Sequence, residues 1–226
     1  MTNLVIGGLT PLTTIDFPGR LSAVVFCQGC PWRCGYCHNP ELLPRRSDTR
    51  LHWDNVMSFL ERRQGLLDAV VFSGGEPTMH EGLFDALLDV KKMGFQVGLH
   101  TAGPYPSRLA RLLPSLDWVG MDIKAPFGQY EKVTGIPGSG TKALESTKLI
   151  LKSGVSCEFR TTLHPYLMEA DTLPQLARSL AALGVHQYVL QEQRSLGARE
   201  TRIEISNALV ARVEPSFEQF NVRRCA

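Results

Sequence analysis

Short apolar segments alternate with longer segments of helical pattern along most of this chain, and this alternation limits the possible folds more than any other feature. Six segments have the length and composition of buried strands, namely residues 21–26, 69–72, 96–100, 118–123, 156–162 and 187–190. Nearly continuous apolar strands are typical of parallel sheets that are covered on both faces. The alternation therefore predicts repeated strand-helix units around a parallel sheet.

The segments between these strands have helical patterns, at residues 53–64, 81–93, 107–113, 141–152 and 172–183, and a further one follows at 203–213. Gly65, Gly94, Gly154 and Gly184 stand at or just beyond helix ends, where a left-handed residue ends a helix. Six units are too few for a closed barrel of eight. We therefore predict an α/β fold, an incomplete (β/α)6 barrel with parallel strands and its site at their carboxyl ends.

The chain of 226 residues is 43% hydrophobic, which suits one compact domain with a substantial core. We expect a single domain over residues 1–226. Within it, residues 1–20 are a lead-in, residues 21–200 form the partial barrel, and residues 201–226 form a C-terminal helix and tail.

The charge distribution narrows the class of partner and the compartment. A formal net charge of +2 comes from 24 basic and 22 acidic residues spread along the chain, without a basic stripe for nucleic acid. No apolar run reaches the roughly 18 to 20 residues that cross a bilayer, and the N-terminus lacks the pattern of a signal peptide. We expect a cytoplasmic protein that binds neither nucleic acid nor membrane. Six cysteines are too sparse for a disulfide scaffold.

Four of these cysteines crowd between Cys27 and Cys37, directly after the first predicted strand. Gaps of three and then two residues separate Cys30, Cys34 and Cys37. Three thiolates can hold one corner of a four-iron, four-sulfur cluster, which usually has four protein ligands. The open iron could take the amino and carboxylate groups of a methionine moiety, so that one electron breaks its carbon-sulfur bond.

Cys27 leaves a second interpretation open. Cys27-x-x-Cys30 together with Cys34-x-x-Cys37 also has the spacing of a four-thiolate zinc knuckle. Against this, Cys27 closes a buried strand, where cysteine is often a small apolar residue. We interpret Cys27 as structural and Cys157 as a core residue, and Cys225 has no assignable role.

Other candidates follow the later strands. Ser73-Gly74-Gly75-Glu76-Pro77 comes directly after the second strand, where glycines let the backbone approach a ligand and a carboxylate could bind an ammonium group. Asp122 and Lys124 share one face at the end of the fourth strand and could reach a ribose hydroxyl or a carboxylate, although an ion pair explains them equally well. His100, Arg160 and His164 are weaker candidates at strand ends.

The three cysteines with an aromatic residue before the last resemble the motif of the radical S-adenosylmethionine (radical SAM) superfamily. The resemblance implies a 4Fe-4S cluster on Cys30, Cys34 and Cys37, and it implies that Tyr36 lies by the adenine of S-adenosylmethionine. It also assigns Gly74, Gly75 and Glu76 to the methionine amino group.

Asp16-Phe17-Pro18-Gly19 before the first strand, Cys37-His38-Asn39-Pro40, and the Asp-x-Lys pattern of Asp122 and Lys124 are similar to the activating enzymes of glycyl radical enzymes. Within that group the opening at residues 14–19 is most similar to the activating proteins of anaerobic ribonucleoside-triphosphate reductases. Activases of formate-lyase type share the cysteine and Gly-Gly-Glu-Pro motifs. Some relatives carry extra cluster-binding cysteines, but residues 42–70 contain none, so we expect one cluster.

The resemblance implies a complete reaction. A reduced flavodoxin or ferredoxin supplies an electron, S-adenosylmethionine is cleaved to methionine and a 5'-deoxyadenosyl radical, and that radical takes a hydrogen from a glycine of a glycyl radical enzyme. The alternatives are activation of a formate-lyase-type enzyme, or a zinc or iron-sulfur binding module without turnover.

Overall fold

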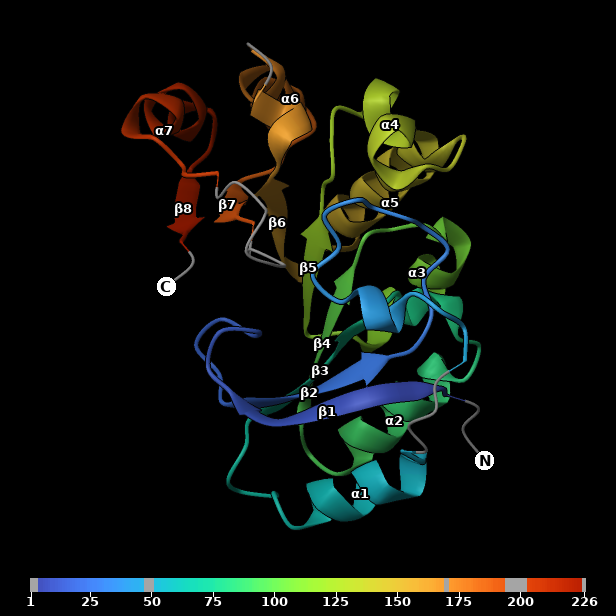
Figure 1. Cartoon of the computed structure of the whole chain (residues 1–226). Coiled ribbons are helices and arrows are strands. Elements are labelled where there is room, and N and C mark those ends of the chain that lie inside the picture. The colour runs from blue at the N-terminus through green and yellow to red at the C-terminus, as the bar shows by residue number, and fades with distance from the viewer. Residues whose placement is uncertain (1–3, 47–50, 169–170, 194–202, 225–226) are drawn as a thin grey trace.

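Figure 1 shows the computed structural model of the chain, which describes residues 4–46, 51–168, 171–193 and 203–224. Its centre is an eight-stranded sheet whose strands neighbour one another in chain order. The strands are β1 (Ile6–Thr13), β2 (Ser22–Cys27), β3 (Ala69–Gly74), β4 (Gln96–Thr101), β5 (Trp118–Asp122), β6 (Ser156–Leu163), β7 (Gln187–Glu192) and β8 (Gln219–Arg223). Pairs from β2 to β8 are parallel, whereas β1 is antiparallel to β2.

The sheet is a partial barrel, as the sequence predicts. Strands β1 and β8 lie at its two ends, and no pairing joins them in the described part of the chain. Figure 1 shows the curved sheet with β8 apart from β1. The α/β class is therefore confirmed, with an open side between the first and last strands.

All six predicted strands are present, but the sequence did not reveal β1 and β8. Strand β1 contains two glycines and a proline, is only partly buried, and shifts register against β2 at two places. Strand β8 has five residues and none of them is buried. Neither segment carries the apolar pattern of a buried strand, because both are edge strands. The predicted lead-in and tail thus each add a strand to the sheet.

Helices cover the outer face of the sheet and build the main hydrophobic core with it. They are α1 (Trp53–Glu61), α2 (Leu83–Lys92), α3 (Pro106–Leu112), α4 (Tyr130–Thr134), α5 (Ser139–Ser153), α6 (Thr172–Ala182) and α7 (Asn207–Val213). Each predicted helix is found within a few residues of its expected bounds, whereas the short α4 was not predicted. Gly154 ends α5 with φ 74°, so the left-handed residue expected there is present. No helix in the described ranges is long and apolar enough to span a membrane.

A second, smaller apolar cluster lies on the inner face of the sheet. It joins Val24, Ala69, Val71 and Trp118 to Phe17, which comes from the segment between β1 and β2. The Phe17 ring lies 5.4 Å from that of Trp118. Because Trp118 and Ala69 begin their strands, Phe17 fills the inside of the partial barrel at the end opposite the carboxyl ends of the strands.

Replacing Phe17 with alanine should remove most of the apolar filling of the inner cluster. We expect Phe17→Ala to lower the free energy of unfolding by about 3 kcal/mol, as is usual for a buried phenylalanine. The matched control is Ile15→Ala, because Ile15 lies two residues away and is 63% exposed. Chemical denaturation of both variants measures the difference. Equal losses would show that the Phe17 contacts do not hold this segment in place.

Candidate active site

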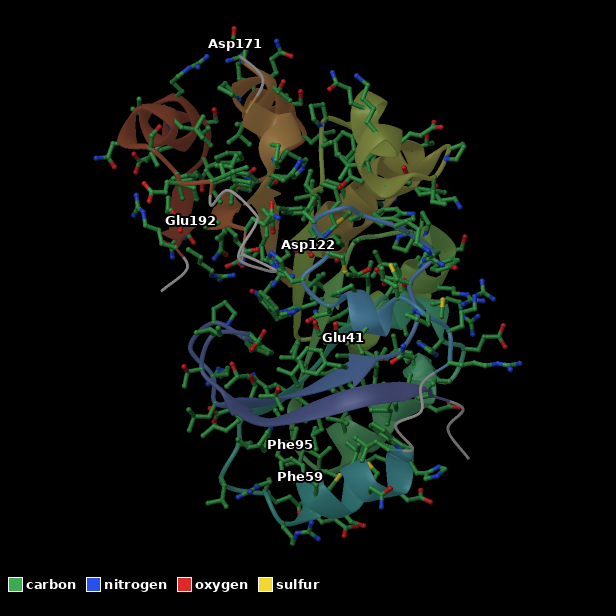
Figure 2. All side chains as sticks on the ribbon, viewed as in Figure 1. Glu41, Phe59, Phe95, Asp122, Asp171 and Glu192 are labelled. Carbon is green, nitrogen blue, oxygen red and sulfur yellow. The ribbon has the colours of Figure 1, made fainter. Side chains whose placement is uncertain are left out.

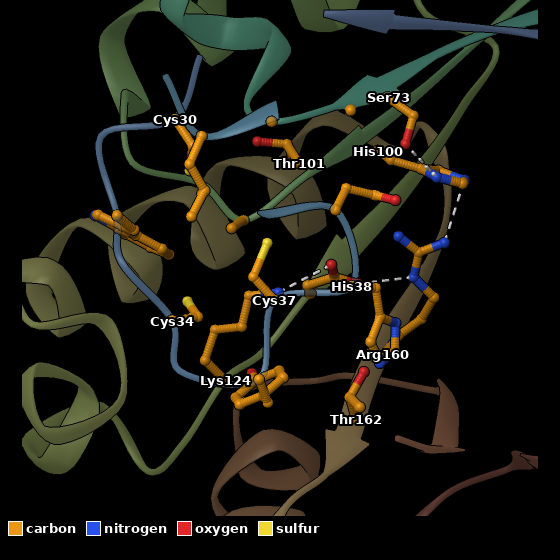
Figure 3. Close-up of a pocket in the computed structure, with 18 of the residues that line it drawn as sticks. Cys30, Cys34, Cys37, His38, Ser73, His100, Thr101, Lys124, Arg160 and Thr162 are labelled. Atoms are coloured by element: carbon orange, nitrogen blue, oxygen red, sulfur yellow. Dashed lines mark hydrogen bonds and ion pairs between the residues drawn. The ribbon is translucent and has the colours of Figure 1, made fainter. Parts of the chain in front are cut away.

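The carboxyl ends of the central strands surround a cavity of about 220 Å³, which Figure 3 shows in close-up. Its lining comprises Asp16, Cys30, Trp32, Cys34, Tyr36, Cys37, His38, Asn39, Leu43, Ser73, Gly74, Gly75, His100, Thr101, Ala102, Asp122, Lys124, Arg160, Thr162 and Gln191. Every predicted site residue lines this cavity except Glu76 and the weaker candidate His164. Residues as distant in the sequence as Asp16 and Gln191, which are 175 positions apart, thus share one site.

The cysteines separate into two environments. Cys30, Cys34 and Cys37 are partly buried and line the cavity, and Figure 3 shows them around one end of it. Cys27 is fully buried in the main core and is absent from the cavity lining. Burial raises the pKa of the Cys27 thiol far above its usual value, as expected for a structural cysteine.

The loop that carries the three cysteines is tied to the segment that follows it. The side-chain amide of Gln28 donates hydrogen bonds to the carbonyls of Glu41 (3.0 Å) and Pro44 (2.8 Å). The amides of the next two residues donate to the carbonyls of Leu42 (2.7 Å) and Leu43 (3.2 Å). These bonds close the loop at its base, so the three thiols are presented together at the end of β2.

The Gly74-Gly75 turn packs directly against the base of the cysteine loop. Gly74 has φ 112°, and a Cβ there would lie 2.5 Å from the backbone N and O of Cys27. A Cβ on Gly75 would lie 2.8 Å from the carbonyl oxygen of Leu42 and would also collide with the carbonyl of Gly29. Both positions therefore require glycine because backbone packs against backbone there, in addition to any approach of a ligand.

The Glu76 carboxylate lies behind this turn and is fully engaged within the chain. Its Oε1 accepts hydrogen bonds from the Thr78 amide (3.1 Å), the Thr78 hydroxyl (2.6 Å) and the Thr101 hydroxyl (2.7 Å). Its Oε2 accepts one from the Ala102 amide (2.9 Å). Burial raises the pKa of Glu76, and these hydrogen bonds oppose the rise. Glu76 thereby joins the turn after β3 to the end of β4, while its expected contact with an ammonium group stays a prediction.

Asp122 and Lys124 lie on one face of the cavity, as expected, and they form an ion pair. The Lys124 Nζ is 3.1 Å from Asp122 Oδ2, and the Arg160 Nε is 2.9 Å from Asp122 Oδ1. Burial alone would raise the pKa of Asp122, but the charges of Arg160 and Lys124 outweigh it and hold that pKa well below its usual range. One anionic and two cationic side chains thus give this wall a net positive charge.

His100 connects this wall to the segment before β2. Burial, together with the charge of Arg160, lowers the pKa of His100 to about 3, so the ring is neutral at pH 7. Its Nε2 lies 2.8 Å from the carbonyl oxygen of Asp16, which only accepts, so we place the ring proton on Nε2. The Ser73 hydroxyl then donates to Nδ1 at 3.2 Å. Arg160 Nη1, 3.1 Å from Nε2, finds no lone pair there.

Tyr36 is held between two other residues of the site. Its ring stacks on that of His164 at a centroid distance of 4.3 Å, and the Lys124 Nζ lies 5.8 Å from its ring centroid. His164 Nε2 is in turn 3.1 Å from the carbonyl oxygen of Lys124. The Tyr36 hydroxyl is buried without a hydrogen-bond partner among the described residues. A buried polar group of this kind suits a bound ligand that supplies the missing hydrogen bond.

Sequence reasoning did not assign Asp16, Ser73, Thr162 and Gln191 to the site, although all four line the cavity. Thr162 could have been found, since it is two residues beyond Arg160 and therefore on the same face of β6. Asp16 gives no such signal, because it belongs to a loop that only the tertiary fold places inside the sheet. Cys225, to which the sequence gave no role, lies outside the described residues.

Comparison with known families identifies this arrangement. The model of the Radical SAM superfamily matches residues 24–180, which is more than half of the chain and includes both the cysteine loop and the Gly-Gly turn. The chain belongs to the radical SAM superfamily. It is therefore an enzyme, and the zinc or iron-sulfur module without turnover is ruled out.

Similar sequences narrow the group within radical SAM enzymes. A protein of Methanocaldococcus jannaschii named as a glycyl-radical enzyme activating enzyme is 32% identical over 187 residues, which are 77% of this chain and 75% of the relative. A pyruvate formate-lyase-activating enzyme of Clostridium pasteurianum is 32% identical over 162 residues, which are 69% and 67% of the two chains. This radical SAM enzyme thus groups with the activating enzymes of glycyl radical enzymes.

Solved structures agree with the fold. A radical SAM methyltransferase from Sphaerobacter thermophilus superposes with a TM-score of 0.72 at 18% identity over 94% of this chain and 68% of that one. Streptococcus suis SuiB bound to S-adenosylmethionine gives a TM-score of 0.67 at 10% identity, covering 88% of this chain. The chain spans about half of the length of SuiB, 48%. At these identities the likeness concerns the fold.

Radical SAM enzymes use a 4Fe-4S cluster and S-adenosylmethionine, and the residues of this cavity fit both groups. In the described ranges no three His, Cys, Asp or Glu side chains converge on a single metal ion, whereas a cluster spreads its thiolates over several irons. Burial raises the pKa of Cys30 to about 12, so its proton would leave only on metal coordination. The backbone of the Gly-Gly turn, which lines the cavity, and the unpartnered Tyr36 hydroxyl offer polar contacts for the second cofactor.

The two cysteine environments predict different effects of substitution. After anaerobic reconstitution, Cys30→Ala, Cys34→Ala and Cys37→Ala should each lose most of their iron and all S-adenosylmethionine cleavage, since three thiolates leave no spare ligand. Cys27→Ala should keep nearly all its iron, because its thiol lies in the core. Iron and sulfide analysis measures this. Iron loss in Cys27→Ala equal to that in Cys34→Ala would contradict the ligand assignment.

The Asp122 ion pairs predict a pH-dependent contribution to stability. Asp122→Asn leaves Arg160 and Lys124 without their counter-charge and should cost about 1 to 3 kcal/mol at pH 7. This is less than the roughly 3 to 5 kcal/mol for a fully buried pair, because Asp122 is partly exposed. A carboxylate whose pKa is lowered by folding stabilises the folded protein at pH values above its ordinary pKa, near 4. This stabilisation is lost as the pH falls below that value. The difference between wild type and variant should therefore shrink below about pH 4. Urea unfolding of the cluster-free proteins across this range measures it, and a constant difference would refute the assignment.

Proposed function

We propose that this radical SAM enzyme cleaves S-adenosylmethionine reductively and installs a glycyl radical on an anaerobic ribonucleoside-triphosphate reductase in the cytoplasm. The observation that carries the proposal is the shared cavity, in which three thiols and a side-chain-free Gly-Gly turn meet on the inner side of an open partial barrel. The similarity to glycyl-radical enzyme activating enzymes supports the class of reaction. The opening segment at residues 14–19 supports the particular partner.

A formate-lyase-type enzyme is the second candidate partner. The relative from Clostridium pasteurianum, which is named as a pyruvate formate-lyase-activating enzyme, supports it as well as any observation supports the reductase. Both candidates share the same chemistry at the cavity. They differ in which protein presents its glycine.

In this proposal each wall of the cavity has one task. The thiolates of Cys30, Cys34 and Cys37 hold the cluster, and Gly74 and Gly75 let the methionine end of S-adenosylmethionine approach the backbone. Glu76 fixes the Gly-Gly turn from behind through its hydrogen bonds to Thr78, Thr101 and Ala102 and is also expected to attract the amino group.

The remaining polar groups orient the rest of the cofactor. The Tyr36 hydroxyl offers its missing hydrogen bond on the nucleoside side, and His164 fixes the plane of its ring. Lys124 and Arg160 hold positive charge opposite the carboxylate of S-adenosylmethionine, while Asp122 keeps both cations in place and can accept from a ribose hydroxyl.

A cluster held by Cys30, Cys34 and Cys37 would supply one electron for the reductive cleavage of S-adenosylmethionine. The products would be methionine and a 5'-deoxyadenosyl radical that could take a hydrogen atom from a glycine α-carbon. The chain's own residues need only bind, orient and shield the reacting groups, since hydrogen-atom abstraction requires no general acid or base. A flavodoxin or ferredoxin is the proposed electron donor.

The proposal predicts a radical on the partner protein. Mixed anaerobically with an anaerobic ribonucleotide reductase, S-adenosylmethionine and a reductant, the enzyme should generate a glycine-centred doublet in electron paramagnetic resonance. Deuterium on the α-carbon of the partner's glycine should appear in 5'-deoxyadenosine.

The same mixture with a formate-lyase-type partner is the control. A radical and deuterium transfer only with that partner would overturn the reductase assignment and keep the activase function. Cleavage of S-adenosylmethionine without a radical on either protein would overturn the proposed substrate class.

A further inference from the structure

A strip of arginines runs over the outer side of the cysteine loop. We call Arg33, Arg45, Arg108 and Arg111 the basic strip. Arg33, Arg45 and Arg111 are exposed, and Arg108 is about one-third exposed at 36% of its side chain. They come from the cysteine loop, the segment after it and α3, so only the fold brings them together.

The contacts between these segments make the strip continuous. The Arg33 Nη1 donates to the carbonyl of Cys30 at 2.7 Å, and the Cys30 amide donates to the carbonyl of Leu43, two residues before Arg45. A Cβ on Gly29 would lie 3.4 Å from the Arg45 Cα and against the methyl group of Met79.

Met79 extends the strip to α3. The Arg108 guanidinium donates to the carbonyls of Met79 and Thr78. Arg108 and Arg111 then line one surface hollow together with His80 and Glu81. These contacts link the segments that carry the four arginines, from the loop at Cys30 to the surface of α3.

The charge of the strip is local and only partly compensated. The whole chain has a formal charge of only +2. The carboxylates near these segments are Glu41, which is exposed (Figure 2), Glu81, which is 89% exposed and pairs with Arg108 at 3.4 Å, and Glu131, which is exposed on α4 one turn before the carbonyl of Thr134 that the Arg33 amide binds. Within the described ranges, no carboxylate lies within ion-pair distance of Arg33, Arg45 or Arg111. Together with Arg46, which is exposed next to Arg45, five arginines against three carboxylates leave this surface positive.

The position of the strip suits delivery of an electron. It covers the outside of the loop whose inner side presents the three thiols to the cavity. Arg33 lies beside the end of α4, and Arg108 and Arg111 lie on α3. Both helices are away from the open side between β1 and β8, as Figure 1 shows for α3, α4 and β8. A protein bound at the strip would therefore leave that open side free for a second protein.

We propose that the basic strip is the docking surface for a small acidic protein that carries one electron to the cluster. The proposal rests on the proposed function, because it presupposes a cluster that must be reduced. In the reduction itself, the carrier gives up one electron and the cluster gains it, with no bond made or broken. Complementary charge at such a surface speeds association and makes its rate fall with salt.

The experiment compares two reductants on the reconstituted enzyme. Formation of 5'-deoxyadenosine is measured with limiting reduced flavodoxin as the probe and, separately, with dithionite, which needs no protein surface. The test variant is Arg45→Glu with Arg111→Glu, since neither side chain contacts the cavity. The charge-matched control is Lys152→Glu with Arg178→Glu, exposed residues on α5 and α6.

At low salt the flavodoxin-driven rate of the test variant should be about tenfold lower than that of wild type, which is within the usual range of electrostatic steering. Its dithionite-driven rate should match wild type, the control variant should keep both rates, and Arg45→Lys with Arg111→Lys should restore the flavodoxin-driven rate.

Two outcomes would contradict the docking surface and leave the proposed function intact. One is that the test and control variants have equal flavodoxin-driven rates. The other is that the test variant loses as much of its rate with dithionite as with flavodoxin, which would locate the damage at the cluster. If wild type formed no 5'-deoxyadenosine with either reductant, the proposed function would fail and the docking surface with it.

Discussion

The structure of the site depends on direct backbone packing between the cysteine loop and the turn after β3. The Gly75 amide donates to the carbonyl of Cys27 at 2.8 Å, and the Glu76 amide donates to the carbonyl of Gly29 at 2.8 Å. No side chain fits between these segments, so Gly74 and Gly75 are required by the chain itself. This contact fixes the three thiols relative to the turn, and both motifs therefore reach one cavity. A substitution at Gly75 would disturb the cysteine loop as well as a ligand, so it cannot separate the two roles.

Two different kinds of interior support this contact. Helices and the outer face of the sheet form an apolar core, in which Cys27 is one of the packed residues. The inner face is apolar only where Phe17 meets Trp118, and it becomes polar toward the carboxyl ends of the strands. The apolar part contributes stability through burial, whereas the polar part contains ion pairs whose desolvation costs nearly as much as their attraction returns. The polar half is therefore better explained by ligand binding than by folding.

The open side of the partial barrel and the basic strip give the molecule two separate faces. The sheet ends at β1 and β8 without closing, and the cavity is lined by residues from β7 as well as from the segment before β2. A large substrate can approach from that side, while the outer surface of the cysteine loop stays accessible to an electron carrier. Any molecule that enters the cavity meets the same charged wall, which is formed by Asp122, Lys124 and Arg160.

The sequence by itself determined the alternation of strands and helices, the partial barrel and the identity of the three thiols, because these depend on local patterns: apolar runs, helix-ending glycines and close cysteine spacing. It also placed Asp122 and Lys124 on one face, since that follows from the period of a strand. Only the tertiary structure decided that β1 and β8 extend the sheet, because edge strands have no buried face to mark them. It alone turned the Glu76 carboxylate toward Thr78 and Thr101 and brought Asp16 and Phe17 inside the barrel. Apart from the local contact between Glu76 and Thr78, these contacts join residues that are 25 to 101 positions apart in the sequence, and no local pattern records which distant groups will meet.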